Sequence, residues 1–295
     1  MAWETWEMWI REGHKMVQKK RWLWRHLRGV EMHGIIVTWN CRGAASKDFF
    51  RFSKYYTDIY KPEILVIMET RCNPKKLHGA LKKLGFQYFL HVDNVGFSGG
   101  ILVASKEENI KVSLISSGDQ YIHLQAHNKN GQEWVFIVVY ASPNEGKRKI
   151  LWENLKNIAN ANNNNPWLVA GDFNDIAFAN EKKGGGLASA KKCGIFRDNM
   201  DMCNLSDLGA NGPRFTWRGP IYHGGQRIYE RLDRAIGNEE WRLMFADVQV
   251  KVLTRVSFSD HHPIMIALTG SINERIPKPF RFESAWWWII VMLID

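Results

Sequence analysis

Residues 167–174, WLVAGDFN, contain the pattern on which the fold prediction rests: a short apolar run that ends in polar residues. An unbroken apolar run of this length predicts a strand buried on both faces, as strands are when helices cover a sheet. Asp172 and Asn174 come directly after the run. Because they are two residues apart, a strand that continued through them would place both side chains on one face.

The same texture recurs along the chain. Short, β-branched apolar runs predict further strands at 35–39, 64–68, 101–103, 134–139 and 264–268. Segments of helical character lie between them, at roughly 47–60, 75–84, 147–161 and 188–202. The alternation predicts a mixed α/β layered fold, with a single domain over residues 34–270.

Several predicted strands end in a polar residue. Asn40 follows the first run, Glu69 the second and Tyr140 the run at 134–139, in addition to Asp172. Loops at the ends of strands are where catalytic residues concentrate, because a rigid sheet positions them. The pattern therefore predicts an active site at one edge of the strands, without naming a reaction.

The composition allows a large core and favours a polyanionic partner. The chain has 295 residues, of which 45% are hydrophobic, enough for one large core or two ordinary domains. The formal net charge of +10 attracts nucleic acid or an anionic membrane surface. The four cysteines lack any zinc-site spacing, and we interpret them as reduced thiols of an intracellular protein.

The two ends of the chain differ from the rest. Residues 1–33 are basic and rich in tryptophan, and predict an N-terminal extension rather than a signal peptide, since they contain no continuous apolar region. Residues 271–295 are predicted to form a C-terminal tail. Its apolar stretch, 286–294, is shorter than the roughly 20 residues that a membrane-spanning helix needs, so no membrane partner is expected.

Six motifs, taken in order, resemble those of the endonuclease/exonuclease/phosphatase superfamily, which includes DNase I-like nucleases, apurinic endonucleases and inositol polyphosphate 5-phosphatases. They are WN (39–40), MET (68–70), VY (139–140), GDFN (171–174), RLD (231–233) and SDH (259–261). Further strings are similar to those of the LINE-type branch, the non-LTR retrotransposons of plant genomes. These are EKKGG (181–185), LSDLG (205–209), GPRFTW (212–217), ERLDR (230–234) and PFRFE (279–283).

The resemblance implies a four-layer α/β/β/α sandwich and a metal-dependent endonuclease that hydrolyses DNA phosphodiester bonds, as in the nicking of a retrotransposon target. It implies Mg²⁺ as cofactor, with Mn²⁺ as an alternative, and DNA as partner, with no obligate protein partner. Nuclear residence follows only from the DNA substrate. A reverse transcriptase should follow such a domain, so we interpret the tail as truncated before it.

The resemblance also assigns roles to residues. Glu69 would be the main metal ligand, since Mg²⁺ prefers hard oxygen ligands, with Asn40 beside it and Asp260 as a second carboxylate. Thr216 matches a hydroxyl position beside the substrate strand. Arg42, also predicted to contact substrate, stands where several apurinic endonucleases have an acidic residue, which argues against abasic-site specialisation.

The catalytic roles fall on the remaining motif residues. Asp172 would align or deprotonate the attacking water, while Asn174 and Tyr140 donate hydrogen bonds to phosphate oxygens. His261 would face the scissile phosphate, with its imidazole held in one tautomer by Asp233. Whether Asp172 or His261 is the formal base stays open. So do two rival functions, an inositol phosphate or phospholipid phosphatase and an inactive remnant that only binds nucleic acid.

Overall fold

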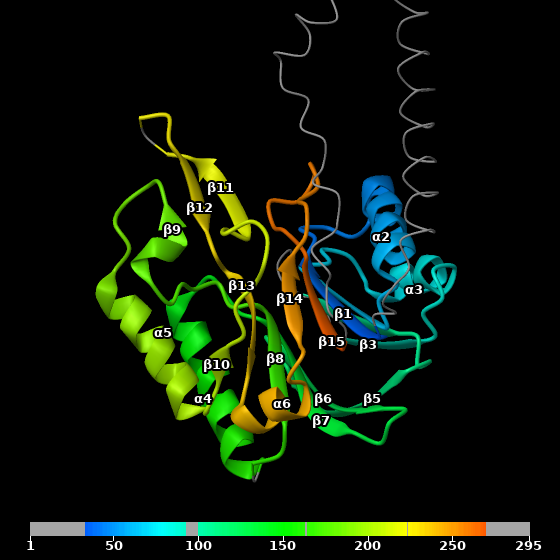
Figure 1. The fold of residues 1–295 in the computed structure, drawn as a ribbon. Coiled ribbons are helices and arrows are strands. Elements are labelled where there is room, and N and C mark those ends of the chain that lie inside the picture. Colours follow the sequence, from blue (N-terminus) through cyan, green and yellow to red (C-terminus); the bar gives the residue numbers. More distant parts are fainter. Residues whose placement is uncertain (1–32, 93–99, 163, 223, 270–295) are drawn as a thin grey trace, which may run out of the picture.

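Two six-stranded sheets make up the centre of the protein, as a computed structural model shows (Figure 1). The structure describes residues 33–92, 100–162, 164–222 and 224–269, so the predicted N-terminal extension, apart from His33, and the predicted C-terminal tail lie outside the described residues. Within the described ranges, no helix is both long and apolar enough to cross a membrane.

The first sheet has the strand order β14-β15-β1-β2-β4-β3. Its members are β1 (His33–Asn40), β2 (Ile64–Met68), β3 (Tyr88–Val92), β4 (Ile101–Ser105), β14 (Gln249–Val252) and β15 (Ile264–Thr269). The second sheet has the order β10-β13-β8-β7-β6-β5. It consists of β5 (Ile110–Gly118), β6 (Tyr121–Asn128), β7 (Glu133–Tyr140), β8 (Trp167–Asp172), β10 (Ser206–Asp207) and β13 (Asp233–Gly237).

A small third sheet, of order β11-β12-β9, projects beyond one end of the second (Figure 1). It comprises β9 (Lys182–Lys183), β11 (Trp217–Ile221) and β12 (Arg227–Glu230). The helices are α2 (Lys47–Tyr60), α3 (Lys75–Lys82), α4 (Glu145–Ala161), α5 (Ala190–Met202), the short α6 (Glu239–Met244) and a 3₁₀ turn, η1 (Ala179–Glu181). The four predicted helices all occur, with ends that differ by up to two residues.

Helices cover both outer faces, so the predicted four-layer sandwich is confirmed (Figure 1). Helices α2 and α3 pack on the first sheet through side chains such as Phe49 and Leu81. Helices α4 and α5 pack on the second sheet through Trp152 and Phe196. A third apolar cluster fills the space between the sheets. Both sheets are therefore buried on two faces, which explains their unbroken apolar runs.

Strand alternation decides which side chains face the space between the sheets. On β8, Leu168 and Ala170 belong to the core between the sheets, whereas Trp167 and Val169 pack toward the helices. Asp172 continues the series of Leu168 and Ala170, and so it lies on the inner face. The same count brings Asn40, Tyr140 and Asp233 to the inner faces of β1, β7 and β13.

Candidate active site

Three of the predicted catalytic residues lie side by side at one end of the central strands of the second sheet. In the ladder, Asp172 is paired with Tyr140 of the parallel strand β7 and with Asp233 of the antiparallel strand β13. Asp172 and Asp233 are both buried, and Tyr140 is half-buried. This edge is the one that the polar strand ends predicted.

Asn40 connects the two sheets at this edge. It ends β1 in the first sheet, and its Nδ2 donates to Asp172 Oδ2 across the sheet interface at 2.9 Å. Its Oδ1 accepts from the backbone N–H of Arg42 at 3.2 Å, which defines the orientation of the amide. The backbone carbonyl of Asn40 accepts from the Ser259 hydroxyl at 2.9 Å. The loop that carries His261 is thereby attached to the end of β1.

His261 lies between the two carboxylates. Its Nδ1 is 2.9 Å from Asp233 Oδ2, and its Nε2 is 3.8 Å from Asp172 Oδ2. Burial lowers the pKa of His261, but the charges of Asp233 and Asp172 and the hydrogen bond to Asp233 outweigh it and raise the pKa to about 9. The imidazole is therefore protonated at neutral pH, and Asp233 accepts its Nδ1–H.

Asp172 has an environment suited to proton transfer. Burial raises its pKa to about 6, against the opposing attraction of His261 and the hydrogen bond from Asn40. A carboxyl group with a pKa near the working pH can take and release protons efficiently. The buried pair Asp172 and His261 thus combines a carboxyl group of raised pKa with an imidazole whose protonated form is stabilised by its acidic neighbours.

The chain turns sharply after Asp172, so the strand does not continue through Asn174, which was the condition for the two side chains to share one strand face. Strand β8 ends at Asp172, and Asn174 adopts a left-handed conformation with φ of 49°. Its backbone N–H donates to Asp172 Oδ1 at 2.9 Å, an Asx turn. The Asn174 amide still lies beside Asp172, but its Nδ2 donates to the carbonyl of Ala141 at 2.7 Å.

Gly171 explains how the sheet reaches this turn. Its φ is 144°, and a Cβ there would lie 1.9 Å from the carbonyl oxygen of Val139 on β7. Any side chain would therefore separate β7 from β8 and displace the neighbouring Asp172. The glycine of the GDFN string is required by this close backbone approach.

Glu69 lies at the end of β2 with a left-handed φ of 54°. Its Oε1 pairs with the guanidinium of Arg71, and its carboxylate lies close enough to the Tyr140 hydroxyl to affect the pKa of that hydroxyl. Burial and the negative charges of Glu69 and Asp172 raise the pKa of Tyr140, so this hydroxyl remains a donor. The structure thus brings Glu69 to the same edge as Tyr140 and Asp172.

Asp260 directly precedes His261, and its carboxylate accepts two side-chain hydrogen bonds. Its Oδ2 accepts from Arg42 Nη1 at 2.6 Å and from Trp217 Nε1 at 3.1 Å. Its Oδ1 is buried and has no hydrogen-bond partner among the described residues. Arg42 is half-exposed on the surface beside this carboxylate, with 49% of its side chain accessible.

Thr216 has a different place from the one expected beside a substrate strand. The residue is fully buried, and its Oγ1 accepts from the backbone N–H groups of Leu232 and Asp233, each at 2.9 Å. The hydroxyl therefore provides the hydrogen-bond acceptor for the backbone N–H groups at the start of β13, and its burial keeps it from contacting a substrate directly. Thr216 acts instead through the backbone of Asp233.

The sequence assigned no role to two residues that make hydrogen bonds at the site, Ser259 and Trp217. Ser259 accepts from the backbone N–H of His261 at 3.1 Å while it donates to Asn40, and Trp217 donates to Asp260. Both belong to strings quoted above, SDH and GPRFTW. The strings were a signal, but the residue types alone did not indicate which groups they would bond.

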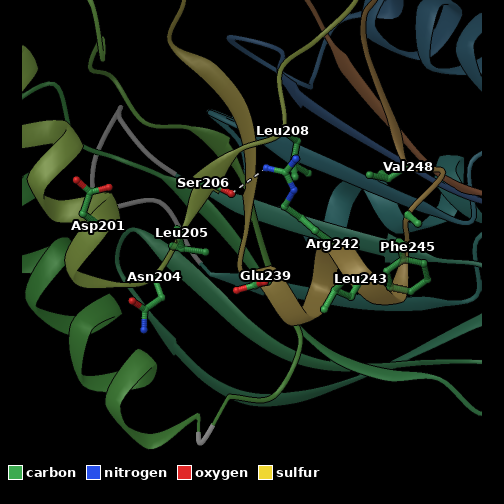
Figure 2. Close-up of a pocket in the computed structure, with 11 residues that line it drawn as sticks. Asp201, Asn204, Leu205, Ser206, Leu208, Glu239, Arg242, Leu243, Phe245 and Val248 are labelled. Atoms are coloured by element: carbon green, nitrogen blue, oxygen red, sulfur yellow. Dashed lines mark hydrogen bonds between the residues drawn. The ribbon is translucent and has the colours of Figure 1, made fainter.

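A separate hollow, of about 760 Å³, lies at the other end of the second sheet (Figure 2). It is formed around α6 and β10, and Leu205, Leu243 and Phe245 line it together with Arg242, which donates to Ser206. Strand β13 runs from Asp233 at the catalytic edge to the residues preceding α6. None of the predicted site residues lines this hollow.

The fold, with a histidine between two buried carboxylates at the joint edge of its sheets, defines the class: a hydrolase of the DNase I-like type. A model of the Endonuclease/Exonuclease/phosphatase family matches residues 37–261, and the chain belongs to this family. No match was found among curated protein sequences.

Solved structures share the fold at low sequence identity. The endonuclease domain of TRAS1, a telomere-specific non-LTR retrotransposon, is 15% identical with a TM-score of 0.59, over 79% of this chain and 97% of that one. The AP endonuclease LMAP from Leishmania major is 15% identical (TM-score 0.62; 81% and 88% covered). The 3′ phosphatase NExo from Neisseria, bound to a product DNA hairpin, is 18% identical (TM-score 0.56; 80% and 100% covered).

Proposed function

We propose that the protein is a Mg²⁺-dependent endonuclease that hydrolyses phosphodiester bonds of DNA. The observation that carries the proposal is the arrangement Asp233–His261–Asp172, in which one buried carboxylate holds the imidazolium and the other lies 3.8 Å from its Nε2. The retrotransposon endonuclease among the structures of the same fold supports a DNA substrate.

In this proposal Asp172 is the base and His261 the positive charge. Asp172, held by Asn40, takes a proton from the attacking water, since its raised pKa suits that transfer. His261, held by Asp233, stays protonated and stabilises the negative charge that develops on the phosphoryl oxygens. Tyr140 adds a hydroxyl donor at the same edge.

The metal would be held by the carboxylates of Glu69 and Asp260, with the side-chain amide oxygen of Asn40 beside them. Their oxygens are hard ligands, which suit Mg²⁺. Asp260 Oδ1 has no hydrogen-bond partner among the described residues, so it is available to bind a metal ion. Asp172, Asp233 and His261 also form a group whose ligand atoms lie within 4.8 Å of one another. We assign that group to proton transfer because the histidine already bonds Asp233. Bound metal would supply a Lewis acid for a phosphoryl oxygen.

Three arginines beside the site favour an extended polyanion as substrate. Arg218 on β11 is exposed, and its backbone N–H donates to the carbonyl of Asp260 at 2.8 Å. Arg227 lies on the partner strand β12, and Arg255 donates to the carbonyl of Ser259 at 2.6 Å. Burial and the nearby guanidiniums of Arg218 and Arg227 lower the pKa of Arg255, as expected for clustered positive charges. Such a cluster fits a phosphodiester backbone.

The test compares two substrates with and without metal. Purified protein is incubated with supercoiled plasmid, and separately with inositol polyphosphates, in Mg²⁺ or in chelator. We expect nicking of the plasmid only with Mg²⁺. Asp172→Ala and His261→Ala should each abolish nicking while DNA binding persists, because water activation and charge stabilisation are separate from backbone contacts.

Asp198→Asn is the matched control, since Asp198 is an exposed carboxylate on α5. It should nick at the wild-type rate. Phosphate release without nicking would replace the proposal by a phosphatase function. Binding of DNA by folded protein with neither activity would replace it by a binding function.

A further inference from the structure

Four charged side chains form a largely buried network on the side of β13 away from the Asp233 carboxylate. Arg234 follows Asp233 on β13, and so its side chain points to the opposite face of the sheet, toward α5. Its guanidinium donates to Glu181 Oε2 at 2.8 Å and to Asp207 Oδ2 at 2.9 Å. It also lies over the ring of Phe196, 5.0 Å from the centroid, and is fully buried.

Arg231 completes the network. It donates to both carboxylate oxygens of Asp207, at 2.8 and 2.7 Å, and to Glu181 Oε1 at 2.8 Å. Each acid therefore binds both arginines, and the four charges cancel. Burial would raise the pKa of Glu181 and of Asp207, but hydrogen bonds and attraction from the arginines lower both, so the acids are ionised at neutral pH.

The network joins the two segments that carry the catalytic carboxylates. Glu181 Oε2 accepts from the backbone N–H of Ala177, in the loop that follows Asp172, at 2.6 Å. The carbonyl of Glu181 accepts from the backbone N–H of Arg231 at 3.0 Å. Arg234 Nη2 donates to the carbonyl of Arg231 at 2.8 Å, so this hydrogen bond spans Leu232 and Asp233. The hydroxyl of Thr216 holds the same backbone from the other side.

These four residues come from the strings EKKGG, LSDLG and ERLDR, and the proposed reaction gives none of the four a role. We propose that Glu181, Asp207, Arg231 and Arg234 are positioning residues for Asp233, which hold its carboxylate against His261 Nδ1. A buried charge that loses its partner must move or become solvated, and its neighbour Asp233 would move with it. The expected effect of this positioning on the nicking rate rests on the proposed endonuclease function.

The test uses Asp207→Asn and Glu181→Gln, which keep shape but remove a negative charge. Asp207 is 24% exposed at its side chain, so its variant disturbs folding less than one at the more buried Glu181. Lys182→Gln is the matched control. It breaks the ion pair between Lys182 and Glu230, 2.7 Å long, in the small sheet. Lys182 directly follows Glu181, and Glu230 directly precedes Arg231, so the control lies next to the network without belonging to it.

The first readout does not require activity. The Nδ1–H proton of His261, hydrogen-bonded to Asp233, should give a low-field resonance in ¹⁵N-histidine NMR of the full chain. Asp207→Asn and Glu181→Gln should shift or broaden that resonance, whereas Lys182→Gln should leave it in place. A wild-type resonance in folded Asp207→Asn or Glu181→Gln protein would overturn the proposal.

The second readout is the single-turnover rate of plasmid nicking. Asp207→Asn should lower the rate about 10- to 100-fold, as small misplacements of catalytic groups do, with DNA affinity unchanged. In the Asp233→Asn background the same substitution should have little effect, because no carboxylate remains to be positioned. An equal fold-loss in both backgrounds would contradict positioning. If the resonance responds as expected but the wild type never nicks DNA, the positioning proposal stands and the endonuclease proposal fails.

Discussion

Asp172 and Asp233 face each other in the ladder between β8 and β13, and both carboxylates reach the one imidazole of His261. Two buried negative charges this close repel one another, which is one reason why the pKa of Asp172 is raised. The histidine relieves the repulsion by carrying a positive charge between them. The two carboxylates consequently have different surroundings: Asp233 accepts the Nδ1–H, and in the proposed mechanism Asp172 remains for the attacking water.

Asp233→Asn tests this division. The amide keeps the size of the side chain but removes the charge that holds the imidazolium, so we expect nicking to slow by about 10²- to 10⁴-fold. Binding of DNA should be unchanged. Single-turnover nicking and a DNA titration measure the two effects. A rate within a few-fold of the Asp198→Asn control would show that Asp233 does not support the reaction.

Glu69→Gln tests the metal assignment. The change removes the negative charge that pairs with Arg71 and lies near the Tyr140 hydroxyl, and with it the main ligand proposed for Mg²⁺. We expect no Mg²⁺-supported nicking and weaker metal binding by calorimetry, with the unfolding temperature near that of wild type. Glu108→Gln, at an exposed position, should behave as wild type. An active Glu69→Gln protein with unchanged Mg²⁺ dependence would remove Glu69 from the site.

Thr216 distinguishes a buried structural hydroxyl from a substrate contact. Thr216→Val leaves the N–H groups of Leu232 and Asp233 buried without their acceptor, and should lower the free energy of unfolding by about 1–3 kcal/mol. Thr216→Ser retains the oxygen and should restore most of the stability and the nicking rate. Urea denaturation measures the first effect. Equal stability of the valine and serine variants would contradict the role in holding β13.

The arginine cluster predicts a strong dependence of DNA affinity on salt. Neutralised phosphates release counterions, so the binding constant should fall steeply between about 50 and 200 mM salt. Arg218→Ala and Arg227→Ala should each reduce the slope of log K against log salt by about one. Exposed Lys192 on α5 supplies the control, Lys192→Ala, with an unchanged slope. An affinity that hardly varies with salt would exclude phosphate contacts.

Acid should weaken the protein through its buried network. Glu181 and Asp207 have folded-state pKa values below their unfolded values of about 4.3 and 3.9. Their contribution to stability is therefore complete above those pH values and is lost as the pH falls through the lower folded pKa. Urea denaturation between about pH 6 and 3 should show a weaker pH dependence for Asp207→Asn than for wild type. Parallel curves would show that the carboxylate is not ion-paired in solution.

The strands and helices that the sequence predicted are those whose pattern of apolar residues can be recognised within one short segment of the chain. An apolar run such as 64–68 indicates a doubly covered strand because burial on both faces leaves no polar position. Strands β5 and β6 alternate apolar and polar residues, as in IKVSL (110–114), so a prediction based on unbroken apolar runs did not include them. The short strands β9 and β10 carry too few residues for any periodic signal.

For the site, residue types and order were readable from the sequence, and the contacts were not. Asp172, Asp233 and His261 could be chosen as a set because their motifs resemble a known order. The sequence by itself determined that polar residues end buried strands, since strand period and burial are properties of neighbouring residues. Only the tertiary structure decided that Asn40 bonds Asp172 across two sheets and that Thr216 serves the backbone. Asn40 and Asp172 are 132 residues apart and meet where the two sheets pack, whereas Thr216 reaches the start of β13 from 16 and 17 residues earlier in the chain.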